Sequence, residues 1–438
     1  MRALSFLFFA FAACGCSTLP ETDTLEIRHA TVVDPASGTV TPDRCIRISG
    51  DRITGVVDCA PEADTASIDA EGQWVIPGLW DMHVHAVWHE DVYEMFFDEF
   101  LRFGVVGIRD MGGDLDVLQQ ARWHLEQPGT IGPYLVAPGP FLDGPEPINP
   151  SLSLALESYR DGVNAVERIA ARGVDFVKLY TLLPKDAALG AMAEAKRQGL
   201  NVVGHLPVEL DLDTALRHGM SGIEHMAVEV GGLCDVSDKA DPCAAVFETL
   251  KEAGVSLTPT LIVRKRRTEL DLPGILELAR IDEMPEVVAQ DWLARREHDL
   301  DALSAKDWKA RRGQFARESA LTTRAIEEGA LVLAGTDAGD LFVPPGASLH
   351  DELALLVQAG MSEMQALRAA TADATAVLNL PDRGAIRKGA KADIVILRSD
   401  PLQDIENTRD IETVIVSGTI VRPTPPARIG AAPVRLPR

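Results

Sequence analysis

The chain has 438 residues, which exceeds one small hydrophobic core and fits a barrel-type domain with a smaller module, or two or three ordinary domains. Its hydrophobic fraction of 46% and charged fraction of 25% are those of a globular protein with a large core. The formal net charge of -24 argues against nucleic-acid binding, because the phosphate backbone is contacted through an excess of lysine and arginine, and it disfavours docking on anionic lipid.

Residues 1–16 have the character of a signal peptide. Arg2 precedes the apolar run ALSFLFFAFAA, which is shorter than the roughly 20 residues that a membrane-spanning helix needs. The small residues around Cys14 and Cys16 resemble the lipobox of bacterial lipoproteins, in which one of these two cysteines would carry the lipid. We therefore expect export, either by plain secretion to the bacterial periplasm or as a lipoprotein anchored to the membrane.

Short β-type runs occupy residues 24–75 and return in residues 383–423. The first group is LEIRHATVV, CIRISG and RITGVV, with turn signals such as Gly50 between the runs, and the second group is ADIVILRSD and TVIVSGTIV. We expect the two groups to pair into one composite module, a small β-sandwich. Residues 424–438 are rich in proline and arginine, and we expect them to form a disordered tail.

Four further cysteines occur in two closely spaced pairs. Cys234 and Cys243 bracket the polar stretch CDVSDKADPC, and Cys45 and Cys59 flank two strand-like runs. Each pair could close a short disulfide, which would agree with an oxidising compartment. Four free thiols or a metal site are the alternatives, and the metal site is less attractive because no CxxC spacing occurs.

Residues 76–382 alternate apolar strands with helical stretches, which is the pattern of βα units and a parallel sheet. Eight such units predict a (β/α)8 TIM-like barrel. A charged segment at about 264–320, after the seventh strand, is expected to be a helical insertion that caps the barrel mouth or extends its rim. The strand candidates in chain order are WVIPGLWDMHVH, GVVGIRDMG, PYLVAPGP, DFVKLYT, NVVGHL, SGIEHM, SLTPTLI and LVLAGTDAG.

Polar side chains stand at the carboxyl ends of these strands, which is where the chemistry of such a barrel lies. In VIPGLWDMHVH the two histidines are two positions apart on an extended strand, so both project from the same face. A convergence of nitrogen and oxygen donors at one barrel mouth predicts a metal site rather than packing alone. The donors are His83 and His85 on the first strand, Lys178 on the fourth, His205 on the fifth, His225 on the sixth and Asp337 on the eighth.

The chain resembles the amidohydrolase superfamily in its VIPGLWDMHVH segment, in the order of these donors and in the stretch DRGAIRKGAKADIVIL. The resemblance extends from about residue 24 to residue 421. It implies two divalent metal ions, with zinc as the expected metal. His83, His85 and Asp337 would then bind one ion, and His205 and His225 would bind the other. Lys178, carboxylated on its amine, would bridge the two.

General chemistry agrees with this implied site. A lysine amine whose pKa is depressed by burial and neighbouring cations can react with carbon dioxide to give an anionic carbamate. Two metal ions roughly 3.5 to 4 Å apart would lower the pKa of a bridging water toward about 7, so that hydroxide attacks at neutral pH. Asp337 would accept the proton and pass it to the departing amine. Tyr180 shares the strand face of Lys178, so its hydroxyl could reach a substrate oxyanion, although core packing explains it equally well.

KLY on the fourth strand is similar to imidazolonepropionase-related and prolidase-like members, which predicts hydrolysis of carbon-nitrogen bonds in amide or peptide-like small molecules. A lactonase or esterase on the same scaffold remains an alternative, as does a non-catalytic, membrane-tethered metal- or ligand-binding protein. The sequence also leaves a homo-oligomer open.

Three further features are interpreted from their positions alone. His350 in SLHDEL is a candidate substrate contact at the mouth, with a solvated helix start as the alternative. Arg109 and Asp110 stand at a strand end, where we expect them to pair with each other. The Gly- and Pro-rich stretch APGPFLDGPEPINP follows the third strand and is a candidate substrate wall.

Overall fold

The computed structural model describes residues 24–61, 66–226, 229–235 and 241–421. The predicted signal peptide, the lipidation candidates Cys14 and Cys16, and the predicted tail at 424–438 lie outside these ranges. Within them, no helix combines the length and the apolar character needed to cross a membrane.

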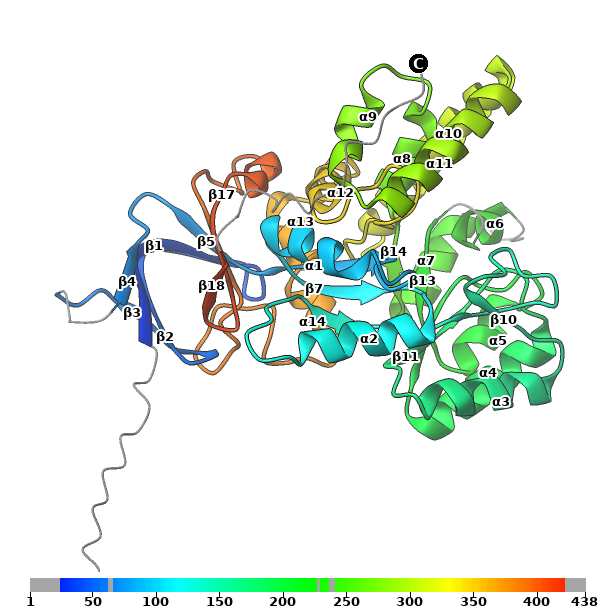
Figure 1. The fold of residues 1–438 in the computed structure, drawn as a ribbon, viewed down its shortest axis with the longest axis horizontal. Coiled ribbons are helices and arrows are strands. Elements are labelled where there is room, and N and C mark those ends of the chain that lie inside the picture. Colours follow the sequence, from blue (N-terminus) through cyan, green and yellow to red (C-terminus); the bar gives the residue numbers. More distant parts are fainter. Residues whose placement is uncertain (1–23, 62–65, 227–228, 236–240, 422–438) are drawn as a thin grey trace, which may run out of the picture.

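Strands from both ends of the chain form one eight-stranded sheet (Figure 1). Its two halves meet where β5 runs antiparallel to β16, with Val75 opposite Ile396. The N-terminal part contributes β1 (Thr24–Asp34), β2 (Thr39–Ser49), β3 (Arg52–Asp58), β4 (Ala66–Asp69) and β5 (Trp74–Pro77). The C-terminal part contributes β16 (Ile394–Leu397), β17 (Ile411–Val416) and β18 (Thr419–Val421).

This module differs from the expected sandwich, because a sandwich consists of two separate sheets and here the hydrogen bonds run through one continuous sheet. Strand β1 is the reason. Its first half pairs with β4 and its second half pairs with β5, and His29 between them has a φ of 56° that redirects the strand. The sheet covers a second apolar core of its own, which includes Ile27, Ile46, Ile53, Val75, Ile394, Ile396 and Ile415.

Both cysteine pairs singled out in the sequence are disulfide-bonded in the structure. Cys45 on β2 joins Cys59 just after β3, with a Cα–Cα distance of 5.0 Å. Cys234 in α6 (Glu229–Asp235) joins Cys243 in α7 (Pro242–Glu252), with a Cα–Cα distance of 4.6 Å.

Each of the eight predicted barrel segments contains a parallel strand, in the predicted order. Strands β6, β7 and β8 form one sheet, and β11 to β15 form most of a second. The eight are β6 (Leu79–Val84), β7 (Val105–Asp110), β8 (Tyr134–Val136), β11 (Phe176–Leu179), β12 (Asn201–Gly204), β13 (Met220–Glu224), β14 (Ser256–Thr258) and β15 (Leu331–Val332).

Backbone hydrogen bonds connect the two parallel sheets at both ends. The segment after β15 bonds to β6, with Met82 N donating to Ala334 O at 3.0 Å and Asp337 N donating to His83 O at 2.7 Å. On the other side, Asp175 N just before β11 donates to Ala137 O just after β8 at 2.9 Å. The strands therefore follow one another with their carboxyl ends on the same side of the molecule.

Two short strands that the sequence did not suggest lie within and just after the Gly- and Pro-rich stretch at 137–150. They are β9 (Phe141–Asp143) and β10 (Ser153–Ala155), and β9 pairs with β11. The buried carboxylate of Asp143 accepts hydrogen bonds from the amides of Ile148 and Leu182 at 2.9 and 2.8 Å. These hydrogen bonds hold the stretch beside the loop that follows β11.

Helices surround the parallel strands (Figure 1). They pack with the strands into the main apolar core, whose largest fully buried side chains include Trp80, Phe96 and Phe100. These helices are α1 (Tyr93–Arg102), α2 (Leu115–Leu125), α3 (Tyr159–Ala170), α4 (Lys185–Gln198), α5 (Leu212–Arg217), α12 (Ala347–Gln358), α13 (Glu363–Ala369) and α14 (Ala372–Val377), together with α6 and α7.

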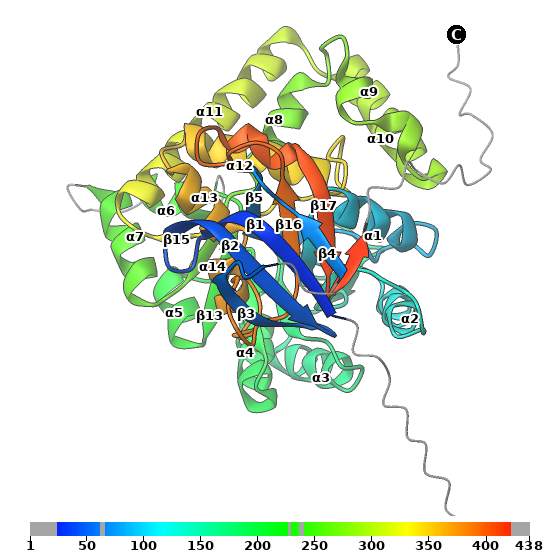
Figure 2. The same cartoon turned by 90° about the vertical axis from the view of Figure 1, so that its left-hand side faces the viewer.

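The predicted insertion is helical and somewhat longer than expected. It comprises α8 (Leu261–Glu269), α9 (Ile275–Leu278), a short 3-10 turn (Ile281–Glu283), α10 (Glu286–Ala302) and α11 (Ala305–Glu327). Figure 2 shows α9, α10 and α11 projecting beyond the strands. Two contacts hold the insertion in place: the buried carboxylate of Glu352 accepts hydrogen bonds from the first two amides of α8, and Trp292 of α10 stacks on Phe342.

Removing the Cys45–Cys59 disulfide should weaken the β module. The bond spans 14 residues, and closing a loop of this size restricts the unfolded chain by about 3 kcal/mol. We expect the free energy of unfolding of the Cys45→Ala/Cys59→Ala variant to be lower by about this amount. The variant should therefore unfold at a lower urea concentration, as followed by circular dichroism. Wild-type protein measured with reductant should be no more stable than the variant, because reductant also breaks Cys234–Cys243. Equal stability of oxidised wild type and variant would contradict a stabilising disulfide.

Candidate metal centre

Five of the six predicted donors lie at the carboxyl ends of the parallel strands or one residue beyond them, and the sixth, Asp337, lies in the segment after β15. His83 and Lys178 lie within β6 and β11, and the other four directly follow β6, β12 and β13 or lie in the segment after β15. Five are buried, and the His85 side chain is 18% exposed. The period of two in β6 turns both of its histidines to the same side, as the sequence indicated.

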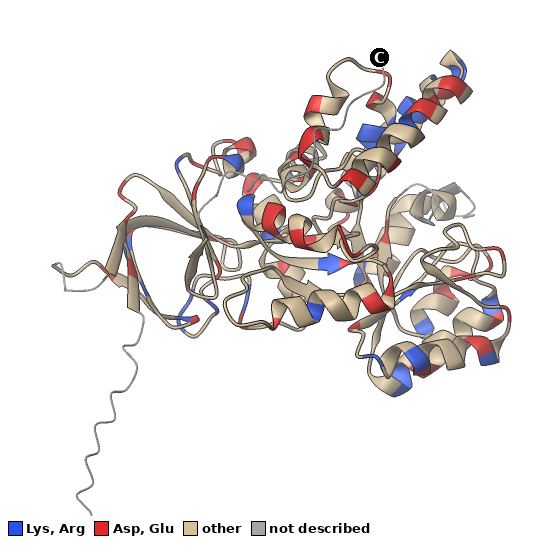
Figure 3. Ribbon diagram, viewed as in Figure 1, with Lys and Arg blue, Asp and Glu red and all other residues tan. Residues whose placement is uncertain are grey.

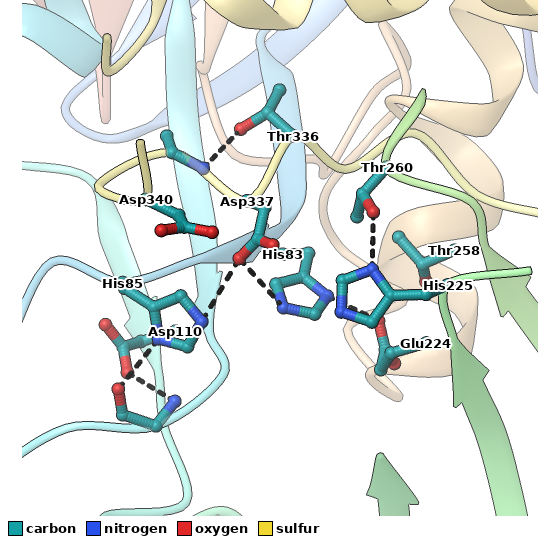
Figure 4. A network of polar contacts seen from close by, with 12 residues as sticks. His83, His85, Asp110, Glu224, His225, Thr258, Thr260, Thr336, Asp337 and Asp340 are labelled. Carbon is teal, nitrogen blue, oxygen red and sulfur yellow. Dashed lines mark hydrogen bonds and ion pairs between the residues drawn. The ribbon is translucent and has the colours of Figure 1, made fainter. Parts of the chain in front are cut away.

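Asp337 lies between the two histidines of β6 (Figure 4). Its Oδ1 atom is 3.4 Å from Nε2 of His83 and 3.2 Å from Nε2 of His85. The first and last strands therefore bring together the three side chains that the resemblance assigns to one metal ion.

The His225 ring neighbours His83, and the His205 ring neighbours His225. The His225 ring lies 4.9 Å from the His83 ring and 5.0 Å from the His205 ring, measured between centroids. Lys178 is buried beside them, and its Nζ atom lies 5.9 Å from the Tyr180 ring centroid. The four histidines thus form a continuous series of neighbouring rings.

Each histidine is oriented through its Nδ1 atom. Nδ1 of His83 lies 2.9 Å from Glu224 Oε2, and Nδ1 of His85 lies 2.9 Å from the carbonyl oxygen of Gly112. In the same way, Nδ1 of His205 bonds to Thr181 Oγ1 at 2.7 Å, and Nδ1 of His225 bonds to Thr260 Oγ1 at 2.6 Å. Partners of this kind fix the tautomer and ring direction of metal-binding histidines, which leaves Nε2 as the ligating atom.

Two of the donors have left-handed backbone conformations. His225 and Asp337 both have φ values of 67°, and Thr260, which holds His225, has a φ of 50°. Such values are uncommon for residues other than glycine, and they cluster at functional sites. In a regular strand Glu224 and His225 would point to opposite faces, but the turn at His225 lets both contact the same cluster.

A buried ion pair between Arg109 and Glu224 lies against the histidine cluster. Arg109 of β7 donates to Glu224 Oε1 at 2.7 Å, to Thr258 Oγ1 at 3.1 Å and to the Met82 carbonyl oxygen at 2.7 Å. Because Glu224 also contacts His83, the charge of Arg109 is linked to a metal-binding candidate through one carboxylate. Removing one partner of such a buried pair leaves an uncompensated charge, which is strongly destabilising.

The expected pairing of Arg109 with Asp110 is wrong. Successive residues of a strand point to opposite faces. Arg109 therefore points to the inner side of the parallel strands, whereas the Asp110 carboxylate points toward the loop after β6. Asp110 accepts hydrogen bonds from the amides of Ala86 and Val87 in that loop, at 2.6 and 3.1 Å, and from the amide of Gly112 just after β7, at 3.0 Å. Asp110 thereby links the loop after β6 to the segment after β7, whose Gly112 carbonyl orients His85.

The protonation states suit metal ligation. Burial lowers the pKa of His83, His205 and His225 well below its usual value, and the charge of Lys178 lowers each further, so all three are neutral at pH 7. Burial also opposes charge on His85, but its contact with Asp337 outweighs this and raises the His85 pKa. Burial would raise the pKa of Asp337, yet the two histidines hold it below its usual value. A cation between His85 and Asp337 would replace the proton that they share.

The remaining two predicted site residues have different surroundings. Tyr180 follows β11 and stacks between Phe141 and His205, with ring centroids 4.6 and 4.3 Å away. Burial raises the pKa of its hydroxyl, which therefore stays protonated. His350 is fully buried in α12, and its ring nitrogens bond to Thr408 Oγ1 and to the Phe103 carbonyl oxygen. The structure thus places His350 outside the cluster, in packing rather than at the mouth.

The structure adds residues that the sequence analysis did not select. Glu224 stands directly before His225 in GIEHM, and Thr181 follows the KLY motif, so nearness to a candidate ligand was the available signal. Thr260 carries no such signal, because its role depends on a contact between segments far apart in the sequence. Arg109 was selected from the sequence, but with the wrong partner.

The donor set fits a divalent cation. His83, His225 and Asp337 each offer one ligand atom, and these atoms lie within 4.8 Å of one another. A second group in the described residues, His29, Asp43 and Cys59, is less suitable because the Cys59 sulfur is in a disulfide. Imidazole nitrogens with a carboxylate are the ligands that zinc and similar metals bind in catalytic sites.

Comparisons with known proteins agree with this geometry. The model of the amidohydrolase family matches residues 74–421. An imidazolonepropionase from Deinococcus deserti is 26% identical over 377 residues, covering 81% of this chain and 85% of the relative. An ochratoxinase from Aspergillus niger is 24% identical over 393 residues, covering 76% of this chain and 72% of the relative.

A solved structure of similar fold is a putative prolidase from Bifidobacterium longum. It has a TM-score of 0.75 and 23% identity, and the match covers 93% of this chain and 97% of the other. The fold is therefore that of the amidohydrolase superfamily, an α/β fold of the TIM-barrel kind. The chain belongs to the amidohydrolase family and is a hydrolase.

Replacing Glu224 with glutamine tests whether the support under His83 matters. The neutral amide carries no charge to compensate Arg109, and its single oxygen cannot accept from both Arg109 and His83, so we expect metal affinity to fall by about 10- to 100-fold. Chelator competition with metal analysis gives the affinity, and Glu252→Gln, on the exposed end of α7, is the matched control. Unchanged affinity in Glu224→Gln would contradict the assigned role.

Proposed function

We propose that this protein is a metal-dependent hydrolase of carbon-nitrogen bonds in amide or peptide-like small molecules. The observation that carries the proposal is the meeting of four histidines, Lys178 and Asp337 at the carboxyl ends of parallel strands, with every histidine oriented through Nδ1. Packing alone does not require four neighbouring imidazoles all to be oriented through the same ring nitrogen.

The proposed scaffold is a closed (β/α)8 barrel. The backbone bonds between β6 and the segment after β15, and between the residues next to β8 and β11, support closure. The isolated parallel bridge between Val84 and Ala338 adds to this support. A closed barrel explains why donors from the first and last strands lie in contact.

We propose two divalent metal ions, with zinc preferred for this donor set. His83, His85 and Asp337 would hold one ion, His205 and His225 the other, and a carboxylated Lys178 would lie between them. Such a pair of ions supplies an activated water molecule and polarises the carbonyl of the substrate. The buried Lys178 would have to react with carbon dioxide as its neutral amine.

The chain's own side chains would handle the protons. Asp337 is ionised beside two histidines, so it can accept a proton from water at Oδ1 and deliver it to the amine that leaves. The Tyr180 hydroxyl stays protonated and can donate a hydrogen bond to an oxyanion. Arg109, Glu224 and the threonines act as positioning residues, because they reach the site only through the histidines.

The choice of a carbon-nitrogen bond is supported by the relatives. Imidazolonepropionase and the prolidase-like structures are named for such reactions, and the KLY motif after Val177 agrees with that branch. We also propose export to an oxidising compartment, supported by the two disulfides, because disulfides persist mainly in such compartments.

The Asp337→Asn variant should lose turnover while keeping much of its metal. The amide cannot accept a proton, so we expect kcat to fall by about 1,000-fold on any amide that the wild type hydrolyses, measured as amine release. The exposed Asp301→Asn on α10 is the matched control. Turnover within a few fold of wild type would refute the proton-transfer role.

The Lys178→Ala variant should lose the bridge between the ions. We expect metal content to fall from about two ions per chain toward one or none, as measured by elemental analysis, with turnover lost in parallel. Added acetate or propionate should restore part of the activity, because a small carboxylate can occupy the vacated position. Lys196→Ala, exposed on α4, is the control. Unchanged metal content in Lys178→Ala would refute the carbamate.

A further inference from the structure

A second cavity, of about 420 Å³, lies at the amino ends of the parallel strands. Its walls include the first residues of β8, β11, β12 and β14, which are Tyr134, Phe176, Asn201 and Ser256. The candidate metal ligands stand at or beyond the carboxyl ends of these strands, so the cavity and the metal centre lie at opposite ends. Tyr134, Asn201 and Asn379 are exposed, and the cavity therefore opens to solvent at the amino end.

Small residues leave this space unfilled. The interior of a barrel of parallel strands is usually filled by layers of bulky branched side chains. Gly222 of β13 stands two positions before Glu224, so it faces the same interior one layer closer to the amino end. A Cβ atom at Gly222 would lie 3.0 Å from Ser256 Oγ and 3.1 Å from Val203 Cγ1, so these residues face one another. The glycine and the serine leave room that larger side chains would fill, and Arg109 borders that room.

Arg109 offers an unused hydrogen-bond donor to this cavity. Its side chain is only 3% exposed, and it belongs to the cavity lining. Nε and Nη2 of Arg109 donate to oxygen atoms of the protein, whereas Nη1 makes no hydrogen bond within the described part of the chain. A buried donor without an acceptor is costly, so an oxygen atom from outside the protein is expected beside Nη1.

The charges that face the cavity are already paired. Among the described residues, its lining includes two charged side chains, Arg109 and Asp175. Arg109 lies 2.7 Å from a carboxylate oxygen of Glu224. Asp175 lies 2.6 Å from a guanidinium nitrogen of Arg122.

An anionic ligand would therefore bring an uncompensated charge next to Glu224, which is unfavourable in a buried place. The whole chain has a formal net charge of -24, and Figure 3 shows acidic segments over most of its elements. This field also repels anions. The cavity is thus suited to an uncharged ligand.

Arg109 links the cavity to the metal centre through two buried contacts. Nη2 of Arg109 donates to Glu224 Oε1 at 2.7 Å, and Glu224 Oε2 lies 2.9 Å from Nδ1 of His83. Burial is the main cause of the low pKa of His83, and the charge of Arg109 lowers this pKa further. A ligand that restrains Arg109 should therefore hold His83 more firmly and strengthen metal binding.

We infer that this cavity is an effector site for an uncharged small molecule whose carbonyl oxygen accepts a hydrogen bond from Nη1 of Arg109. A carbonyl supplies the missing acceptor without adding a charge. The apolar side chains of Val136, Phe176 and Val203 also line the cavity and can pack against the rest of the molecule. The volume of about 420 Å³ is within the range of ligand pockets, roughly 300 to 1,000 Å³. The site is separate from the proposed hydrolytic centre and does not depend on the reaction performed there.

Acetophenone is a suitable probe, because it is uncharged, carries one carbonyl oxygen on an apolar ring and cannot be hydrolysed. Ethylbenzene lacks the carbonyl, and benzoate has a similar shape with a negative charge. We expect metal-loaded protein to bind acetophenone at least about 10-fold more tightly than either compound, as measured by ligand-detected NMR, since each lacks a neutral acceptor for a charged donor. Crystals of the metal-loaded protein soaked in acetophenone should show its oxygen about 2.9 Å from Arg109 Nη1.

A cavity-filling variant assigns the binding to this place. Val203→Phe should abolish acetophenone binding by occupying the cavity, whereas Val40→Phe, at a position 46% exposed on β2, should bind as wild type does. In chelator competition, saturating acetophenone should raise the metal affinity of the wild type by about 5-fold. The same addition should leave the metal affinity of Val203→Phe unchanged.

Three results would overturn the inference. They are benzoate binding as tightly as acetophenone, ordered water alone in the cavity after soaking, and full acetophenone binding by a folded Val203→Phe variant. If Val203→Phe does not fold, the soaked crystals decide between acetophenone in the cavity, which supports the inference, and water, which contradicts it. Unchanged metal affinity of wild type with bound acetophenone would contradict the effector role.

Discussion

The backbone contact between β6 and the segment after β15 is the interaction on which the rest of the site depends. His83 and Asp337 are far apart in the sequence, yet Asp337 N donates to the His83 carbonyl oxygen at 2.7 Å. The His85 amide donates to Ala338 O at 2.7 Å, and the buried carboxylate of Asp81 binds the amide and hydroxyl of Thr336 at 3.0 and 2.6 Å. These bonds fix the register of the two segments, and the register puts the Asp337 carboxylate between the two histidines.

The buried charges form the second level of organisation. Arg109, Glu224 and His83 lie in series inside the strands, while Asp337 and Asp340 lie at the mouth, where Arg267 and Arg295 approach from the insertion. A buried ion pair contributes little net stability compared with apolar packing, so its value here lies in fixing geometry. The left-handed conformation at His225 costs conformational free energy, and it occurs where two adjacent side chains, Glu224 and His225, must both contact the histidine cluster.

Much of this could be predicted from the sequence because two simple periodicities apply. Alternation along VIPGLWDMHVH placed His83 and His85 on one face, and the regular sequence of βα units placed the later donors at the same end of the strands. The pairing of the two chain ends followed from their shared β character. In each case the deciding information was local in the sequence.

The sequence-based predictions were wrong where contacts between different segments of the chain determine the position of a side chain. Arg109 and Asp110 are neighbours in sequence but face opposite ways, and His350 is held in packing by Thr408, which is 58 positions away. Strand β1 pairs with two strands in succession and has a left-handed residue, His29, between them, which composition does not indicate. Arg267, Arg295 and Arg311 come from three helices of the insertion and line one cavity. The sequence indicated that the insertion is helical but not how its helices pack.

The central claim is that the six side chains hold two metal ions side by side. Anomalous X-ray diffraction from crystals of the zinc-loaded protein tests it most directly. The account predicts two zinc peaks roughly 3.5 to 4 Å apart, one beside His83, His85 and Asp337 and the other beside His205 and His225, with density extending Lys178 as a carbamate between them. A single peak, or peaks away from these residues, would contradict it.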